Sequence, residues 1–187
     1  MKTHSAKSAQ GNRFVVLLRG VNVGKGNRVP MAHFKQALEQ IGYTDVVTLL
    51  NSGNAIFSSS SKSIAKHITA IAGILNEQFE VSTPVVVKTA AQFQSIVANN
   101  PVQVPEADHS KYLVAFAQAD ASISELTELL PQPQSTEAFK VTATAAYLYC
   151  PNGILQSKIA AALIGKAGRN VTTRNWATIL KINARIT

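Results

Sequence analysis

The sequence predicts an α+β fold made of two sequential subdomains. Short apolar runs rich in β-branched residues, which are typical of strands, alternate with amphipathic helical patterns. The first part of the chain reads strand-helix-strand-strand-helix-strand, and the second part repeats strand-helix-strand-strand-helix. An acidic, proline-containing stretch over residues 99–110 separates the two series. This order is that of the split β-α-β, or ferredoxin-like, unit, so we expect antiparallel sheets with helices on one face.

We expect four segments along the chain. A polar, disordered tail over residues 1–12 precedes a first α+β subdomain over 13–98, a linker over 99–110 and a second subdomain over 111–187 that ends in a helix. The chain of 187 residues has the size of one large domain or two small ones, and folding can bury about 70% of its unfolded surface. It therefore needs no disulfide or metal to stabilise a core.

The first subdomain opens with an apolar run over residues 14–18, which has the pattern of a strand buried on both faces. Residues 31–41 have the spacing of an amphipathic helix, with Pro30 at its first position and Gly42 after its end. The remaining elements are a hairpin of two strands, a long helix and a last strand, over residues 45–50, 55–58, 64–79 and 84–88.

The second subdomain follows a short helix over residues 90–97. Its first helix, 122–130, begins with a Ser122-x-x-Glu125 capping box and stops at Pro131-Gln132-Pro133. Thr173 is the expected N-cap of the final helix, which buries Trp176, Ile179 and Leu180. The other elements are a first strand, a hairpin and a helix, over residues 112–117, 138–142, 145–150 and 157–164.

Charge is distributed unevenly along the chain, whose formal net charge is +8. Residues 1–95 hold ten Lys or Arg against four Asp or Glu, residues 96–139 hold one against six, and residues 140–187 hold seven against none. A basic excess attracts anionic partners, but it does not distinguish nucleic acid from a small phosphorylated ligand or from an ordinary solvated surface.

The sharpest chemical signal is the loop Arg19-Gly20-Val21-Asn22-Val23-Gly24-Lys25-Gly26-Asn27-Arg28-Val29-Pro30. It carries three cations and no acid, and its glycines let backbone N–H groups approach a ligand. Its glycine spacing matches neither a P-loop nor a dinucleotide-binding fingerprint. We interpret it as an anion-binding loop, with a surface turn bearing solvated charges as the alternative.

Cations also stand at three predicted helix starts, where the helix dipole favours acids instead. Arg28, Lys158 and Arg174 each lie beside such a start, with no acid in the first turn. This placement makes sense if an anion binds there, because N–H groups and cations then reinforce one another. The alternative is that these long side chains simply extend into solvent. We predict that the Arg19–Arg28 loop, the Asn51–Asn54 turn and the start at Arg174 converge in space.

Other reactive residues indicate structure more than chemistry. Trp176 has the spacing of a core residue, and Cys150 has the pattern of a small buried hydrophobe. No Cys/His cluster has zinc spacing, so we expect neither a metal nor a cofactor. The single cysteine, and an N-terminus without the apolar core of a signal peptide, favour the cytoplasm, and no apolar run long enough to span a membrane is present.

Five blocks of sequence occur in order after Phe14: Arg19-Gly20-Val21-Asn22-Val23-Gly24, Arg28-Val29-Pro30-Met31, Asn51-Ser52-Gly53-Asn54, Ser157-Lys158 and Thr173-Arg174-Asn175-Trp176. Together they resemble the domain-of-unknown-function 1697 family of bacterial proteins. The resemblance extends over nearly the whole chain from Phe14 onward. It implies an α+β fold of two related subdomains, and it implies no activity, because the family's name assigns none.

Two functions fit these patterns. The first is non-catalytic binding of a phosphate-bearing ligand, a nucleotide or nucleic acid, and the second is an enzyme acting on a small anionic substrate. Both would use the same charged, amide and hydroxyl side chains, which are Arg19, Asn22, Lys25, Arg28, Asn51, Ser52, Asn54, Lys158, Arg174 and Asn175. No catalytic residue is assigned, because acids are absent near the basic motifs, and the histidines His4, His33, His67 and His109 lie in the tail, two predicted helices and the acidic linker. A purely structural or interaction role is a third possibility.

Overall fold

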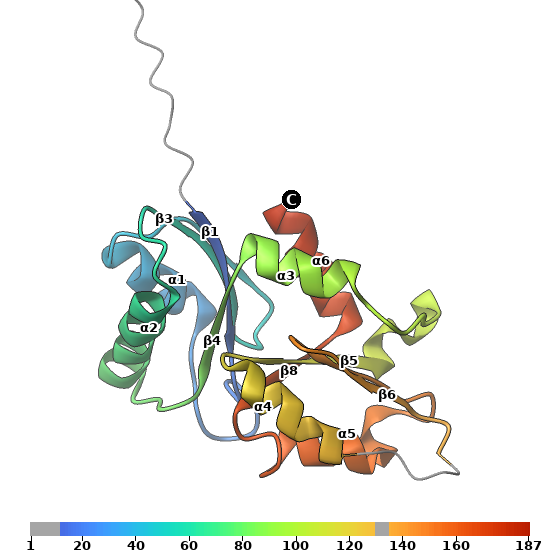
Figure 1. The fold of residues 1–187 in the computed structure, drawn as a ribbon. Coiled ribbons are helices and arrows are strands. Elements are labelled where there is room, and N and C mark those ends of the chain that lie inside the picture. Colours follow the sequence, from blue (N-terminus) through green and yellow to red (C-terminus); the bar gives the residue numbers. More distant parts are fainter. Residues whose placement is uncertain (1–11, 130–134) are drawn as a thin grey trace, which may run out of the picture.

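The computed structural model describes residues 12–129 and 135–187 (Figure 1). The tail predicted over residues 1–12 lies outside this part of the chain except for Asn12, which opens the first strand. The predicted helix stop at Pro131-Gln132-Pro133 also lies outside it. The described residues form an α+β structure with two four-stranded antiparallel sheets.

The first sheet has the strand order β2-β3-β1-β4. Its strands are β1 (Asn12–Leu18), β2 (Thr44–Leu49), β3 (Asn54–Ser59) and β4 (Val85–Thr89). Helices α1 (Met31–Gln40) and α2 (Ile64–Phe79) cover one of its faces, on the left of Figure 1. Residues 14–18 of β1 are all buried, which confirms the predicted strand with two buried faces.

The second sheet repeats this arrangement with the order β6-β7-β5-β8. Its strands are β5 (Tyr112–Ala117), β6 (Ala138–Val141), β7 (Ala146–Tyr149) and β8 (Val171–Asn175). One face packs against α4 (Asp120–Ser124), the 3₁₀ helix η2 (Glu125–Glu128) that continues it, and α5 (Lys158–Ile164), which comes after the 3₁₀ turn η3 (Ile154–Gln156). Each sheet thus places the first strand of its half at a central position.

Two further helices, α3 (Ala90–Ala98) and α6 (Trp176–Ile186), pack against each other between the two sheets (Figure 1). They share a central core with the second faces of both sheets, to which β1 contributes Val15 and Leu17 and β5 contributes Val114 and Phe116. The expectation of helices on one face only is therefore wrong. Both central strands are apolar on both faces, so each sheet must be covered twice.

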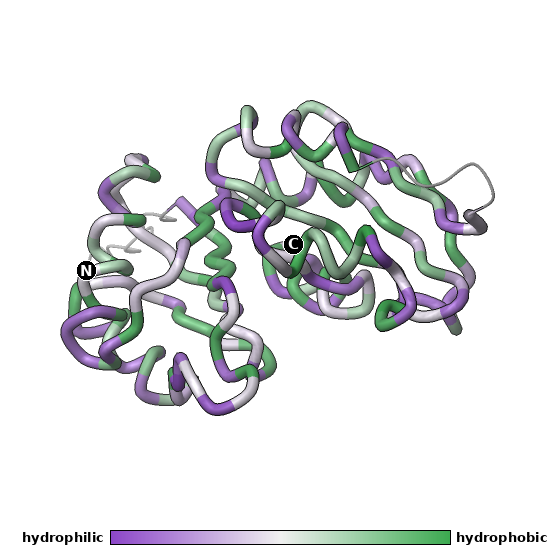
Figure 2. Tube along the Cα trace, turned by 90° about the horizontal axis from the view of Figure 1, so that it is seen from below, coloured by the Kyte–Doolittle hydropathy of each residue, from purple (hydrophilic) through white to green (hydrophobic). Residues whose placement is uncertain are grey.

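Figure 2 shows how hydropathy varies along the chain in this fold: hydrophobic residues follow the strands, and hydrophilic residues gather in the surrounding loops. Among the described residues, none of the helices is long and apolar enough to cross a membrane.

The structure corrects the predicted start of the C-terminal helix. Residues 171–175 form β8, which pairs with β5, and α6 begins only at Trp176. Asn175, not Thr173, is the N-cap. The β-branched residues at the start of this segment suit a strand as well as a cap, which misled the sequence interpretation. Trp176 is buried as expected, whereas Leu180 is 37% exposed.

The predicted capping box at Ser122 and Glu125 is also absent. Helix α4 begins earlier, at Asp120, after Ala119, which has no side chain to cap it. The helix then tightens into η2 at Glu125. Asp120 in the first turn favours the earlier start, because its charge complements the helix dipole.

The segment over residues 99–110 is attached to the fold by side-chain hydrogen bonds. Tyr112 donates to Asn100, and the Tyr149 hydroxyl donates to Asp108 Oδ2 at 2.6 Å. The segment ends in a 3₁₀ helix, η1 (Glu106–Lys111), and Val102 packs against the central core. The division of the chain into two subdomains at this segment stays a prediction.

Candidate functional site

The loop from Arg19 to Pro30 closes on itself through Asn22. The Asn22 side chain donates from Nδ2 to the Val29 carbonyl at 2.8 Å and accepts the Val29 N–H at 2.9 Å. Its Nδ2 also donates to the Asn51 carbonyl at 2.8 Å, which ties the loop to the turn between β2 and β3. Asn22 has φ 57°, a left-handed conformation that asparagine accepts more readily than most residues. This asparagine therefore shapes the loop.

Arg174 crosses from β8 to the first sheet and is only 6% exposed. Its Nη2 donates to the carbonyls of Leu18 and Ser52, each at 2.8 Å, and its Nε donates to Asn54 Oδ1 at 2.5 Å. Its Nη1 donates within β8, to the Thr172 hydroxyl and the Thr173 carbonyl. Every guanidinium N–H therefore has a protein acceptor, and none is left for a ligand.

The charge of Arg174 is stabilised by carbonyl dipoles. In the described part of the chain, the ion pairs within 4 Å join Lys35 to Glu39 and Lys111 to Asp108, and none involves Arg174. Burial lowers the pKa of Arg174 to about 10, so the side chain remains charged at neutral pH. The prediction that this arginine lies in the first turn of a helix is wrong, because residues 171–175 form β8 and α6 begins at Trp176. It is a buried structural cation on a strand.

Arg19 makes the reciprocal connection, from the first half to the second. Its Nη1 donates to the Val171 carbonyl of β8 at 3.0 Å, and its Nη2 donates to the Ile164 carbonyl at 2.8 Å and the Gly165 carbonyl at 3.1 Å. The Thr172 hydroxyl adds a bond to the Leu18 carbonyl at 3.2 Å. The end of β1 and the start of β8 are thus joined from both sides.

The Asn51–Asn54 turn has the conformation needed to accept hydrogen bonds from Asn22 and Arg174. The buried Asn54 donates from Nδ2 to the Leu49 carbonyl at 2.9 Å and to the Ser52 hydroxyl at 3.0 Å. Gly53 has φ +77°, and a Cβ there would lie 2.5 Å from Val21 Cγ2. Only glycine fits this position. The three motifs predicted to converge do converge, but most of their polar side chains bind the protein itself.

Three of the predicted residues remain exposed beside a small cavity or on its loop: Lys25, Arg28 and Asn51. The cavity has a volume of about 260 Å³ and is lined by Asn22, Arg28, Val29, Pro30, Met31 and Asn51. Within the described residues, neither Lys25 nor Arg28 has a carboxylate within ion-pair distance. Unlike Arg19 and Arg174, these cations are therefore available to a ligand.

The N-terminus of α1 borders the same cavity. Its N-cap is Pro30, which offers no capping side chain, and its first turn holds no acid. The first intrahelical bond runs from the Phe34 N–H to the Pro30 carbonyl, so the N–H groups of residues 31–33 have no partner within the helix. By contrast, Ser63, Thr89, Ser157 and Asn175 cap α2, α3, α5 and α6 with their side chains.

A second cavity, of about 410 Å³, adjoins the first, since Arg28 and Pro30 line both. Its other lining residues are His33, Glu77, Gln78, Phe79 and Glu80. Sequence reasoning missed these acids, because they lie far along the chain from Arg28. The predicted fold could have indicated this proximity. Strands β1 and β3 are antiparallel, so the helices that follow them run in opposite directions. The end of α2 therefore lies beside the start of α1.

Two of the predicted site residues do not contribute to the cavity beside α1: Lys158 lies away from the loop, and Asn175 stabilises a helix. Lys158 is the exposed first residue of α5, whereas Arg19 contacts the opposite end of that helix. The structure therefore does not bring Lys158 to the loop. Asn175 caps α6, because its Oδ1 accepts the Thr178 N–H at 2.9 Å.

Buried reactive side chains elsewhere are held by the core. Cys150 is buried, as predicted, and burial raises the pKa of its thiol to about 11, which keeps the thiol neutral and unreactive. His67 bonds Tyr43 Oη through Nδ1 at 2.7 Å among aromatic rings. In the two described ranges, no group of three or more His, Cys, Asp or Glu side chains is placed to hold a metal ion.

Comparison with known proteins shows the same fold elsewhere. A solved structure, described as conserved bacterial protein SP0830 from Streptococcus pneumoniae, superposes with a TM-score of 0.78 at 22% sequence identity, and the match covers 94% of this chain and 99% of that one. None of the curated proteins matches the sequence. A family model described as protein of unknown function (DUF1697) matches residues 12–147. The chain therefore belongs to the DUF1697 family.

Proposed function

We propose that this protein binds a phosphate-bearing anion at the N-terminus of α1, between the glycine-rich loop and the β2–β3 turn. The observation that carries the proposal is the uncapped first turn of α1 beside a cavity that Arg28 lines. Free N–H groups and the positive end of a helix dipole favour a phosphate, and a nearby guanidinium adds charge-assisted hydrogen bonds. Asn51 lines the same cavity and supplies a neutral polar group.

The ligand in this proposal is a nucleotide or a nucleic acid, held without catalysis. Lys25 and Arg28 are the charge partners, and each is exposed on the loop. Two sheets with the same strand order support the related proposal that each half is a ferredoxin-like unit, with the loop inserted after the first strand of the first unit.

The test compares Arg28→Gln with a control cation at the far end of the first sheet. Lys62 is exposed, and it comes after β3 beyond Ser59, which pairs with Asn12 at the opposite end of β1 from the loop. Titration calorimetry with inorganic phosphate, a nucleotide and an oligonucleotide should show binding that Arg28→Gln weakens by about 1.5–3 kcal/mol. Lys62→Gln should leave it unchanged. Equal affinities in the two variants would reject the site.

Salt dependence then separates the two ligand classes. Affinity for a nucleic acid should fall with a log–log slope of about −0.9 per phosphate neutralised on a duplex and about −0.7 on a single strand. A small phosphate ligand should show a shallower dependence. Oligonucleotide binding that is insensitive to salt would contradict the electrostatic mechanism.

The adjoining cavity favours a second candidate, an enzyme acting on a small phosphorylated or otherwise anionic substrate. His33, Glu77 and Glu80 supply candidate acids and bases in the cavity that shares Arg28 with the first. Turnover of a bound phosphate ester, abolished by His33→Asn while binding persists, would support this candidate. Binding without turnover would reject the enzyme and support non-catalytic binding.

A further inference from the structure

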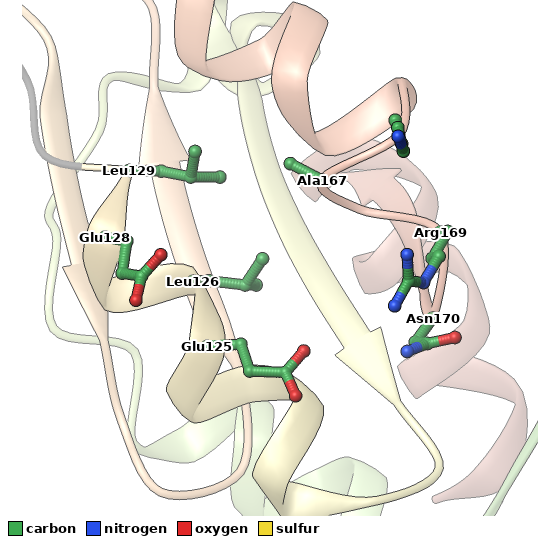
Figure 3. A pocket seen from close by; sticks show the side chains of 8 residues that line it. Glu125, Leu126, Glu128, Leu129, Ala167, Arg169 and Asn170 are labelled. Atoms are coloured by element: carbon green, nitrogen blue, oxygen red, sulfur yellow. The ribbon is translucent and has the colours of Figure 1, made fainter.

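A third cavity, larger than the two beside Arg28, lies in the other half of the molecule and contains none of the site residues predicted from the sequence. It has a volume of about 460 Å³ and lies between η2 and the loop that joins α5 to β8 (Figure 3). Ligand sites usually have volumes of about 300–1,000 Å³, so it can accommodate a small molecule. Figure 3 shows Leu126 and Leu129 pointing from one wall toward Ala167 on the other, which makes an apolar floor.

One wall is acidic. Glu125 and Glu128 lie three residues apart on the 3₁₀ helix η2, where side chains at this spacing eclipse, so both carboxylates project from one side. Both side chains are exposed. In the described residues, no lysine or arginine lies within 4 Å of either carboxylate. Two like charges held side by side favour an added cation.

The facing wall is basic and firmly built. Lys166 and Arg169 line it together with Asn170. The loop is tightened by hydrogen bonds from the Gly168 N–H to the Ala162 carbonyl at 3.0 Å and from the Arg169 N–H to the Lys166 carbonyl at 3.2 Å. Gly168 admits no side chain, since a Cβ would lie 1.8 Å from the Leu163 carbonyl oxygen.

Arg19 fixes this loop at both ends, because it binds the Gly165 carbonyl before the basic residues and the Val171 carbonyl after them. The cations are therefore presented by a backbone that is already ordered before a ligand arrives. Such preorganisation lowers the entropy cost of binding.

Opposite charges thus face each other across an apolar floor without forming ion pairs. A ligand that pairs with both walls needs an ammonium at one end, a carboxylate at the other and apolar groups between them. We propose that this cavity binds a short zwitterionic peptide, with its N-terminal ammonium on Glu125 and Glu128 and its C-terminal carboxylate on Lys166 and Arg169. An extended chain spans at most about 3.3–3.6 Å per residue, so two or three residues suit a cavity of this size.

The test uses dileucine and two blocked forms, N-acetyl-dileucine and dileucine amide. Titration followed by amide chemical shifts should show saturable dileucine binding, with the largest shifts in residues 125–129 and 166–170. Loss of either terminal charge should weaken binding at least about tenfold, the effect expected when a charged hydrogen bond is lost.

Paired variants separate the walls. Glu125→Gln with Glu128→Gln should weaken dileucine binding at least about tenfold yet leave N-acetyl-dileucine binding unchanged, because that peptide has no ammonium to lose. Lys166→Gln with Arg169→Gln should weaken dileucine binding by at least about tenfold yet leave the binding of dileucine amide unchanged, because that peptide has no carboxylate to lose. Glu106→Gln and Lys158→Gln each neutralise an exposed charge outside the cavity and serve as controls. Absence of saturable dileucine binding, equal affinity for the blocked peptides, or an equal effect of the controls would overturn the proposal.

Discussion

The first strands of the two halves end in matching contacts. Arg19 comes directly after β1 and donates to the Val171 carbonyl on β8, the last strand of the other half. Gln118 comes directly after β5, and its Oε1 accepts the Val87 N–H of β4, the last strand of the first half, at 2.9 Å. In both cases, the residue after a central strand joins the two halves.

Beyond these contacts, the two halves differ. The second half passes from Gln118 through Ala119 directly into α4, whereas the first half inserts the loop that ends at Pro30 before α1 begins. The shared contact serves the fold, and the inserted loop adds exposed cations and a cavity. Residues of one sequence motif therefore have separate roles: Arg19 joins the two halves, and Arg28 remains available to a ligand.

Removing Arg174 should have the largest effect on the junction. Arg174→Ala removes the arginine donor from the Ser52 carbonyl and from the buried Oδ1 of Asn54, so we expect a loss of about 3–5 kcal/mol in the free energy of unfolding. Arg174→Lys should also destabilise the protein, because an ammonium cannot reproduce the planar set of donors. Urea denaturation measures both variants. Unchanged stability of Arg174→Ala would contradict the structural role.

The turns of the two halves offer the next contrast. Gly53→Ala forces a Cβ to within 2.5 Å of Val21 Cγ2 at a positive φ, and we expect a loss of about 2–4 kcal/mol. In the second half, the exposed Thr144 lies in the turn between β6 and β7, and Thr144→Ala should change stability by no more than about 0.5 kcal/mol. Thermal unfolding measures both variants. Similar losses of stability for Gly53→Ala and Thr144→Ala would contradict the claim that only the first turn requires its native residue.

The two matching contacts should each contribute less. Arg19→Ala should cost about 1–2 kcal/mol, since its carbonyl partners are partly exposed, and Gln118→Ala about 0.5–1.5 kcal/mol. Their effects should add in the double variant, because the two bonds share no partner. Chemical denaturation of the single and double variants tests this. A neutral Gln118→Ala would break the correspondence between the halves.

At neutral pH the smallest expected effect concerns Cys150, because the charge state of its thiol influences stability only at high pH. Burial raises the thiol pKa from 9.0 to about 11, so folding favours the neutral form. Its stabilising contribution is complete below pH 9 and is lost as pH rises through 11. Unfolding free energies measured from about pH 8 to about pH 11 should therefore fall more steeply for the natural protein than for Cys150→Ala. Parallel curves would contradict the burial effect.

The order of helices and strands could be predicted well from the sequence, because alternating helical and strand patterns are local. The position of Arg174 could not, since Thr172 and Thr173 suit both a strand and a helix cap. The partners of Arg174 are mainly backbone carbonyls, which every residue carries, so no side-chain pattern reveals them. This is why a buried structural arginine resembled a binding residue.

The cavity residues could be predicted only in part. Arg28 and Asn51 belong to motifs that the sequence displays, and both line the cavity beside α1. Glu77 and Glu80 meet Arg28 only through the packing of α1 beside α2, whereas His33 lies in the first turn of α1, five residues after Arg28. Likewise, Glu125 and Arg169 face each other because η2 and the α5–β8 loop flank one groove, and neither sequence segment indicates the other.

The most direct measurement of the anion site is a phosphate titration followed by backbone amide chemical shifts. If the uncapped turn of α1 binds the anion, saturable shifts should be largest for the N–H groups of residues 31–33 and should extend to Asn22 and Asn51, and Arg28→Gln should suppress them. Shifts that are absent, or that centre on the start of α5 at Lys158, would contradict the proposal that the inserted loop makes the binding site.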